Sequence, residues 1–334
     1  SALAFPLSGL FAGIVITSLI QSSSATIALV VASVASGAIS LENSVFIVLG
    51  ANIGTTVTSA IVTLAHVDRG EQFEKVVPAA ILDDMYKILN VSLFFLLEIT
   101  LGVLHKTSQW LVSQLAGVSL VNGSIEKWSG ILDVGSDSLI QWLAEKIYLV
   151  IPSIEVVAAL LGLISLMLLL LSLRIASDIF GKYFVGRVKS WIRSKEPSHL
   201  KNFVFGFLAC WLLQSSSLTI SIVLPLVAHE VFLLRGMYYF AIGAALATTC
   251  DFSQIISYLK FGFVGLQTGL SHILLNVFGA IIFGLVPGLN ELPLKMARRV
   301  AAFITQPKWS GVRLLIYVIT LFFAIPLLMI ALFS

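Results

Sequence analysis

The sequence predicts an all-α polytopic membrane protein with two inverted-topology repeats, each containing a re-entrant helical hairpin and a broken transmembrane helix. The composition is the first observation behind this fold class: of 334 residues, 58% are hydrophobic and 11% are charged, whereas soluble domains carry roughly 25% charged residues. The second is a series of apolar runs long enough to cross a ~30 Å hydrocarbon core as helices. The third is a polar segment that occurs twice, at corresponding places in two halves of the chain.

The apolar runs predict helices and not the strands of a membrane barrel. The clearest runs are Ile147–Leu173, Phe261–Leu285 and Val312–Phe333. Barrel strands alternate apolar and polar residues, and these runs do not. The chain also starts in an apolar segment at Ser1, without a Met, so we expect further residues upstream.

The remaining composition argues against other classes of protein. The formal net charge is only +3, and no basic stripe interleaved with aromatic residues indicates a nucleic-acid partner. Cys210 and Cys250 both lie in apolar stretches, which argues against a structural disulfide framework.

An internal repeat organises the chain. Gln21–Ser24 reads Gln-Ser-Ser-Ser, and the same four residues recur at Gln214–Ser217, 193 positions later. At this spacing, 14 of the 38 pairs between residues 21–58 and 214–251 are identical. Two halves with polar interruptions at corresponding places predict a binding site where the two repeats meet.

Each Gln-Ser-Ser-Ser segment is flanked by apolar runs that are short for a membrane crossing. Runs of roughly 10–14 residues suit re-entrant segments better than full crossings. A longer segment interrupted by small polar residues follows each hairpin, and lipid tolerates such interruptions only where they line a protein-enclosed cavity. The short runs are Leu7–Ile20, Ala25–Ala35, Phe203–Leu213 and Leu218–Ala228, and the interrupted segments are Val45–Ala65 and Tyr238–Leu259.

Basic residues in the loops predict the orientation, because cytoplasmic loops carry an excess of Lys and Arg. Ala176–Lys201 and Leu289–Arg313 are basic and are placed in the cytoplasm, whereas the charge-balanced, Trp-containing stretch His105–Lys146 is placed outside. The first hairpin then enters from outside and the second from inside a plasma membrane that the chain crosses several times. The predicted organisation is 1–104, first inverted repeat; 105–146, external interfacial loop; 147–175, connecting transmembrane helix; 176–200, basic cytoplasmic loop; 201–288, second inverted repeat; 289–334, basic loop and C-terminal transmembrane helix.

The serines of the two motifs predict an anion site. The second helix of a re-entrant hairpin presents unpaired N–H groups and the positive end of its dipole, which favour an anion. Hydroxyl groups at that point add neutral donors, and two such tips would surround a tetrahedral oxyanion. The alternative is that the hydroxyls bond to carbonyls of their own helix or to a neighbouring helix. The candidate residues are Ser22, Ser23, Ser24, Ser215, Ser216 and Ser217.

Neutral oxygen donors beside the motifs predict sites for Na⁺, the only metal ion that the sequence indicates. Amide, hydroxyl and backbone oxygens coordinate Na⁺ in the broken helices of transporters. Packing between helices is the alternative for the Thr pairs and for Asn52. The candidates are Gln21, Asn52, Thr55, Thr56, Gln214, Thr248 and Thr249.

Charged residues also lie inside predicted apolar segments. Asp84 and Lys87 fall within the predicted span Val77–Leu104, where a charge costs on the order of 2.5–3.5 kcal/mol and usually marks an ion or substrate path. A local pair of Asp83 or Asp84 with Lys87 is the alternative. Asp251 has a comparable position in the second half, so Lys87 and Asp251 are candidates for charge coupling. His272 is expected to be a hydrogen-bonded interior histidine and not a metal ligand.

These motifs resemble the type II sodium–phosphate cotransporter family. The resemblance rests on Gln-Ser-Ser-Ser-Ala-Thr from Gln21, Gly-Ala-Asn-Ile-Gly-Thr-Thr from Gly50, the second Gln-Ser-Ser-Ser from Gln214, and the stretch His272–Asn276. It implies Na⁺-driven uptake of inorganic phosphate by alternating access. It also implies that serines of both motifs hold phosphate, and that Gln, Thr and Asn residues of the two repeats hold Na⁺.

The sequence departs from this family pattern at places that bear on the cations. Asp84 matches the family's acidic residue, linked to a Na⁺ site, but Lys87 stands where the family commonly has Asn. In the second repeat, the expected Asn and Gly are Ala245 and Ala247, and Asp251 stands where the first repeat has Thr58. These differences leave the number of Na⁺ ions, and even the identity of the coupling ion, open.

The leading hypothesis is therefore a secondary transporter that couples Na⁺ to phosphate and is not an enzyme, with phosphate and the lipid bilayer as its partners. A proton-coupled carrier or an exporter of phosphate or a related oxyanion is the alternative within transporters. An intramembrane serine hydrolase would need a base beside each serine, and the repeat supplies none beyond His272. A channel and a homodimeric assembly stay open.

Overall fold

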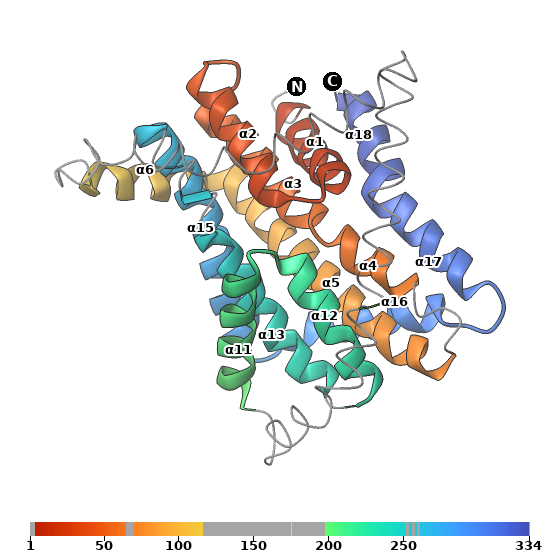
Figure 1. Ribbon diagram of the computed structural model, residues 1–334. Coiled ribbons are helices and arrows are strands. Elements are labelled where there is room, and N and C mark those ends of the chain that lie inside the picture. The colour runs from red at the N-terminus through yellow and green to blue at the C-terminus, as the bar shows by residue number, and fades with distance from the viewer. Residues whose placement is uncertain are drawn as a thin grey trace, which may run out of the picture.

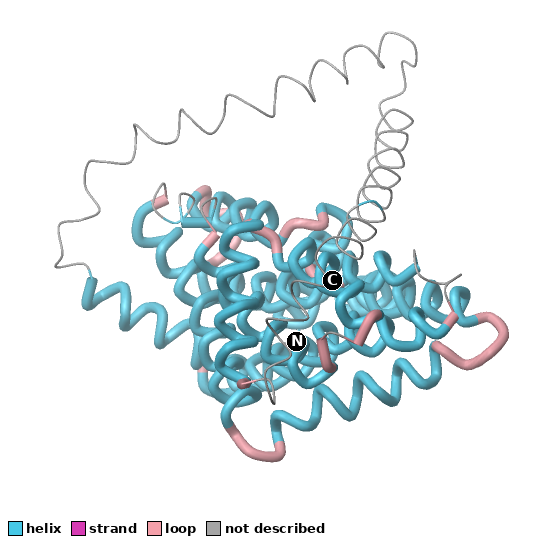
Figure 2. The backbone as a smooth tube through the Cα atoms, turned by 60° about the horizontal axis from the view of Figure 1, so that its bottom comes forward, coloured by secondary structure: helices cyan, strands magenta, loops and turns pink. Residues whose placement is uncertain are grey.

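The computed structural model describes residues 4–64, 70–115, 175, 198–230, 232–251, 254, 255, 258 and 261–333. Within these ranges the regular structure is entirely helical and contains no strand, which confirms the all-α prediction. Short loops join most of the helices (Figure 2). The predicted connecting helix 147–175 and basic loop 176–200 lie almost wholly outside the described residues.

The described helices fall into the two halves that the repeat predicts, followed by a C-terminal group (Figure 1). The boundaries of α2 and α3 match those of α12 and α13 at the repeat spacing. The first half holds α1 (Ala4–Ile20), α2 (Ser23–Ala35), α3 (Leu41–Gly54), α4 (Val57–Thr63), α5 (Glu71–Leu101) and α6 (Val103–Leu115). The second holds α11 (His199–Leu213), α12 (Ser216–Ala228), α13 (Leu234–Ala247), the 3₁₀ turn η4 (Thr248–Cys250) and α15 (Gly262–Leu285). The C-terminal group holds η5 (Leu289–Glu291), α16 (Leu292–Ile304), α17 (Ser310–Ile319), the π-helical turn η6 (Thr320–Ala324) and α18 (Ile325–Phe333).

Three described stretches are long and apolar enough to cross a membrane: Leu41–Thr63, Gly262–Leu285 and Ser310–Phe333. A fourth candidate is the pair formed by α5 and α6, which is bent by 73°. The helices on either side of each Gln-Ser-Ser-Ser motif are shorter, with 13 to 17 residues, as their apolar runs predicted.

Glycines set the closest helix contacts in both halves. A Cβ atom on Gly50 of α3 would collide with the carbonyl oxygen of Leu10 in α1, and one on Gly243 of α13 would collide with that of Phe203 in α11. Only glycine lets two helix backbones approach so closely. The pairs α1/α3 and α11/α13 are therefore each joined along a backbone seam, which fixes where the ends of α1 and α11 lie.

Helix α5 occupies the centre of the molecule and contacts α3, α4, α12, α13, α15 and α16. The prediction of an unbroken span Val77–Leu104 was wrong in its bounds, because α5 starts at Glu71 and ends at Gly102, whose φ of 66° is left-handed. The chain then turns into α6, whose first backbone N–H groups are bonded by the Glu98 carboxylate. The apolar run continues through this turn, so hydrophobicity alone did not reveal it.

Part of each predicted loop is helical. Residues 103–115, mostly within the predicted external loop, form α6, and the remainder of that loop lies outside the described residues. The segment counted as a basic loop contains α16, which buries Leu294, Ala297 and Ala301 and exposes its Lys and Arg residues. Its amphipathic pattern was hidden because only charges were counted there.

Candidate functional site

The two Gln-Ser-Ser-Ser motifs adopt the same backbone conformation, here called the first and second tips (residues 21–24 and 214–217). Gln21 and Gln214 have left-handed φ values of 58° and 54°, a conformation uncommon outside glycine. Ser22 and Ser215 then take extended φ values and accept a hydrogen bond at 3.2 Å from the backbone N–H three residues on. This is the arrangement of a helix N-cap, so each motif ends one helix and starts the next.

The following serines of each tip face the core of the protein. Ser23 and Ser216 are buried, with exposed fractions of 7% and 3%. The Ser216 hydroxyl has no hydrogen-bond partner among the described residues. A buried polar group without a partner is rare and costly, so this hydroxyl indicates a place where a polar ligand could bind.

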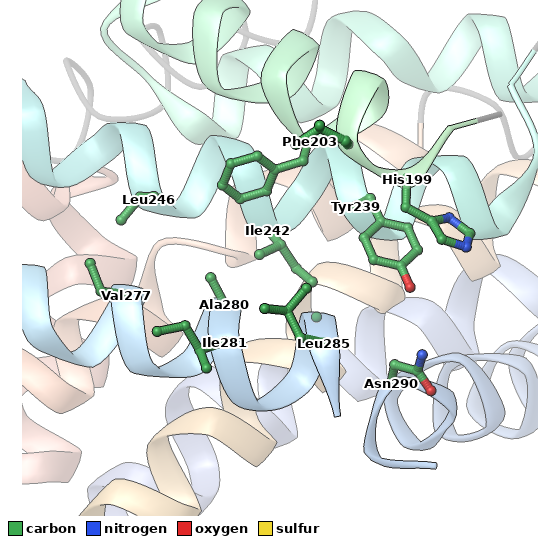
Figure 3. A pocket seen from close by; sticks show the side chains of 12 residues that line it. His199, Phe203, Tyr239, Ile242, Leu246, Val277, Ala280, Ile281, Leu285 and Asn290 are labelled. Atoms are coloured by element: carbon green, nitrogen blue, oxygen red, sulfur yellow. The ribbon is translucent and has the colours of Figure 1, made fainter. Parts of the chain in front are cut away.

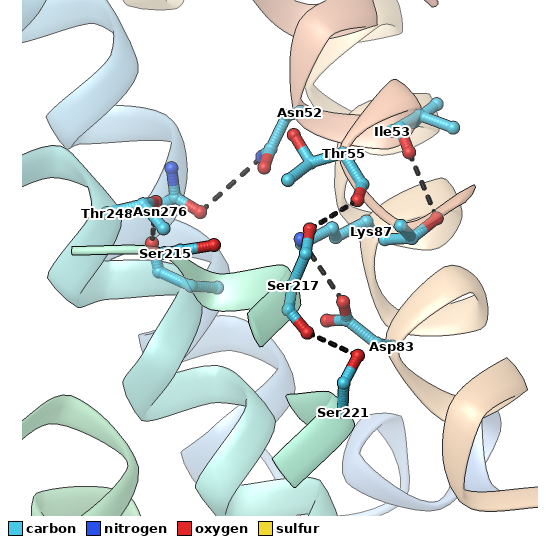
Figure 4. A network of polar contacts seen from close by, with 12 residues as sticks. Asn52, Ile53, Thr55, Asp83, Lys87, Ser215, Ser217, Ser221, Thr248 and Asn276 are labelled. Carbon is cyan, nitrogen blue, oxygen red and sulfur yellow. Dashed lines mark hydrogen bonds and ion pairs between the residues drawn. The ribbon is translucent and has the colours of Figure 1, made fainter. Parts of the chain in front are cut away.

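Hydrogen bonds join each tip to the opposite half of the chain. Ser217 donates to the carbonyl oxygen of Thr55 at 2.8 Å, where α3 ends (Figure 4). Ser24 donates to Oδ2 of Asp251 at 2.5 Å, directly after η4. The acceptor is neutral in one case and a carboxylate in the other.

The predicted Thr pairs lie at the ends of the broken helices. Thr55 and Thr56 separate α3 from α4, whereas Thr248 and Thr249 begin the 3₁₀ turn η4 after α13. Each hydroxyl donates to a carbonyl of its own preceding turn, at distances of 2.7–3.0 Å. A hydroxyl that donates in this way keeps lone pairs for a cation, so these contacts are compatible with Na⁺ binding.

Amide side chains connect the first break to α15. Asn52 Nδ2 donates to Asn276 Oδ1 at 3.4 Å, and Asn276 donates to the carbonyl of His272 at 3.1 Å. Both Asn side chains are buried. Figure 4 draws them in the same polar region as Ser215, Ser217 and Thr248.

The charged residues of α5 are paired in two different ways. Lys87 Nζ lies 3.2 Å from Oδ2 of Asp83, and both side chains are almost fully buried. The structure thus contains the local ion pair that the sequence left open as an alternative for Lys87. Asp84 Oδ2 instead accepts a 2.6 Å hydrogen bond from Tyr317 of α17, while its Oδ1 has no partner among the described residues.

A buried polar chain leads away from Ser24. Gln254 Nε2 donates to the Ser24 hydroxyl at 3.1 Å, and Gln254 Oε1 accepts from Tyr258 at 2.5 Å and lies 3.1 Å from His272 Nδ1. His272 is therefore an interior, hydrogen-bonded histidine, as predicted. The sequence analysis missed Gln254 and Tyr317; an amide inside an apolar stretch three residues after Asp251 was a usable signal for the first.

The two motif glutamines are half-buried and lie at the bends of the tips. Gln214 Nε2 donates to the carbonyl oxygen of Trp211 at the end of α11. Their positions bring a carbonyl and an amide to the start of each short helix. The structure thus places all the predicted residues at the two tips, at the two breaks or on central α5.

A separate cavity of about 700 Å³ lies between α11, α13 and α15 (Figure 3). Its lining is mostly aliphatic and aromatic, with Phe203, Ile242 and Ile281 on its walls and His199 and Asn290 at one end. None of the predicted site residues lines it. An apolar space of this kind does not suit an oxyanion, and the polar region of the tips remains the candidate site.

These features define a helical membrane protein whose buried polar groups gather where apolar helices break, the class to which many transporters belong. The chain belongs to the Na⁺/Pi-cotransporter family, whose model matches residues 1–125 and 168–328. This finding confirms the resemblance predicted from the motifs, and it places the chain in a family of transporters and not of enzymes.

Curated relatives agree at low identity across most of the chain. Sodium-dependent phosphate transport protein 2A of Mus musculus is 23% identical over 384 residues, which cover 96% of this chain and 60% of that protein. Protein 2B of Homo sapiens is 23% identical over 410 residues, covering 98% and 59%. The chain thus spans about 60% of the length of the relatives it matches. No solved structure matches it.

Proposed function

We propose that the chain is a sodium-coupled symporter of inorganic phosphate that works by alternating access. The observation that carries the proposal is the pair of tips with one backbone conformation, each hydrogen-bonded to the break in the other half. Sodium-dependent phosphate transport is what the names of its relatives state. Residues 1–104 and 201–288 are the two inverted repeats of this proposal, and the polar region between them is the transport site.

Phosphate binds between the two tips in this proposal. The N-terminal N–H groups of α2 and α12 and the hydroxyls of Ser22–Ser24 and Ser215–Ser217 supply donors without a compensating positive charge. Neutral donors at helix N-termini favour anions. The unpartnered Ser216 hydroxyl supports this assignment, because a ligand oxygen would satisfy it.

Na⁺ binds beside the tips, at the two breaks and at Asp84. Thr hydroxyl and backbone oxygens, the amide oxygens of Asn52 and the two motif glutamines, and the unpaired oxygen of Asp84 are hard ligands of the kind Na⁺ takes. Na⁺ would offset the charge of the anion and favour closure of the loaded site. Each net charge moved contributes about 2.3 kcal/mol per 100 mV of membrane potential, so the stoichiometry decides how strongly voltage drives uptake.

The Asp83–Lys87 pair has a supporting role in this scheme. Because Asp83 already neutralises Lys87, the ammonium adds no net charge to the core, and Asp84 remains available to a cation. Crossed hydrogen bonds between the halves give the empty protein a closed contact that the bound ions and phosphate would replace. Alternating access then consists of exchanging these contacts.

Uptake of labelled phosphate into proteoliposomes tests the proposal. An inward Na⁺ gradient should drive accumulation, and replacing Na⁺ by choline should abolish it. Ser23→Ala and Ser216→Ala should each reduce uptake strongly, because they remove donors from the tips. Ser33→Ala is the matched control: this hydroxyl bonds only to the Leu29 carbonyl of its own helix. Absence of Na⁺-driven uptake by the wild-type protein would contradict the proposal.

A proton-coupled carrier is the second candidate, and Asp251 is the observation that favours it. A carboxylate beside a tip serine can carry a proton where the other half has only Thr58. Uptake that persists in choline and follows a pH gradient would support this candidate over Na⁺ coupling.

A further inference from the structure

Asp251 is an ionisable group at a point where the two halves differ. At the repeat spacing it corresponds to Thr58. The Asp251 backbone is extended immediately after η4, and the side chain is 7% exposed. Its Oδ2 accepts the Ser24 hydroxyl at 2.5 Å. A carboxylate is thus directed at one side of the proposed phosphate site, and only at that side.

The buried chain beyond Ser24 fixes the direction of this hydrogen bond. Tyr258 donates to Gln254 Oε1, so the amide nitrogen of Gln254 faces Ser24 and donates to its oxygen. The Ser24 oxygen therefore already accepts one hydrogen bond, and its own hydrogen points to Asp251. An ionised carboxylate can only accept hydrogen bonds, but it offers about four lone-pair positions. Asp251 is held as an acceptor of hydroxyl hydrogens.

We propose that Asp251 makes the site selective for oxyanions that carry a hydroxyl group, phosphate above all, by accepting the hydrogen bond of that hydroxyl. The Ser24 hydroxyl already makes such a contact in the structure, and a P–OH group would make another. The inference rests on the proposed phosphate site at the first tip.

Chemistry separates the two most similar oxyanions at this position. Near neutral pH, inorganic phosphate keeps at least one hydroxyl, whereas sulfate has none. A sulfate oxygen facing Asp251 would set lone pairs against a carboxylate with no hydrogen between them. A site built to bond a ligand hydroxyl rejects the analogue that lacks it by large factors, and a repulsive group adds to that rejection.

Asp251→Asn tests the inference, because the amide keeps the shape and can still accept the Ser24 hydrogen bond but also donates. Proteoliposomes with an inward Na⁺ gradient are supplied with labelled phosphate or labelled sulfate. We expect the wild-type protein to take up phosphate and to be unaffected by excess sulfate. In Asp251→Asn the ratio of phosphate to sulfate uptake should fall on the order of 100-fold. The control is Glu42→Gln, which removes an exposed carboxylate at the start of α3 and should leave the ratio unchanged.

Other outcomes overturn the inference in distinguishable ways. A variant that retains its phosphate-to-sulfate ratio but needs more Na⁺ would make Asp251 a cation ligand. A variant without any transport is examined in detergent: phosphate alone should raise the melting temperature of the wild-type protein, and both anions should raise that of Asp251→Asn. If sulfate stabilises neither protein, the selectivity role is wrong. If phosphate stabilises the wild-type protein but is not transported, the symport proposal fails and the selectivity role stands.

Discussion

The two tips are alike, whereas the two breaks that they contact are not. Gln21 and Gln214 share a left-handed bend, and the serines that follow share the same N-cap. At the breaks, α3 continues into α4 after two residues, while α13 passes into a 3₁₀ turn and then the extended Asp251. The comparison teaches that the framework for the anion is duplicated but that ionisable groups are placed in one half at a time.

The same contrast holds for the central helices α5 and α15. α5 carries the buried Asp83–Lys87 ion pair, and the related stretch of α15 carries His272 and Asn276, which are neutral hydrogen-bonding groups in this structure. Variants can show which of these differences matter and whether the shared framework is equally important in both halves.

Breaking the α5 ion pair should have the largest effect. Lys87→Met leaves the Asp83 carboxylate buried without its partner, and removing one member of a buried pair costs about 3–5 kcal/mol. The double variant Asp83→Asn, Lys87→Met should recover most of that loss, because replacing both charges is often neutral. Thermal unfolding in detergent measures both. Lys75→Met, which removes an exposed pair with Glu71 on the same helix, should change little.

The glycine seams should be equally sensitive in the two halves. Gly50→Ala and Gly243→Ala each force a Cβ atom against a facing carbonyl, and overpacking of this kind costs about 1–3 kcal/mol. Gly284→Ala is the matched control, since its Cβ would meet only Ile242 at 3.8 Å. A loss confined to one half would contradict the idea that the frameworks are equivalent.

The tip serines should differ in their contribution to stability. Ser24→Ala removes a hydrogen bond to a carboxylate, worth about 1.5–3 kcal/mol, whereas Ser217→Ala removes one to a carbonyl, worth about 0.5–1.5 kcal/mol. Unfolding of the two variants without phosphate measures the difference. Equal losses would indicate that Asp251 exerts no special pull on the first tip.

The smallest effect should come from Tyr317→Phe, which removes the α17 hydrogen bond to Asp84. We expect a loss of about 1 kcal/mol in stability together with an altered Na⁺ dependence of uptake, because one oxygen of Asp84 is then released. An unchanged Na⁺ dependence would remove Asp84 from the proposed cation ligands.

The local parts of this structure could be predicted from the sequence, whereas its long-range polar contacts could not. Serines after short apolar runs predicted the tips, and doubled Thr residues predicted the breaks, because both signals are local in the chain. The turn at Gly102 and helix α16 were missed, since an apolar run continues across one and a run of charges masks the other. The contacts of Ser24 with Gln254 and of Asp84 with Tyr317 join residues more than 200 positions apart, and a single sequence carries no signal for such pairs.

The glycine seams also bear on which parts of the molecule can move. Backbones that touch without intervening side chains have no soft layer in which to slide, so α1 with α3, and α11 with α13, should travel as two rigid bodies. The compliant surface between them is then the set of crossed contacts at Ser24 and Ser217. Spin labels placed within one glycine-linked pair should keep their spacing throughout the transport cycle, while labels on α3 and α13 should report two distances.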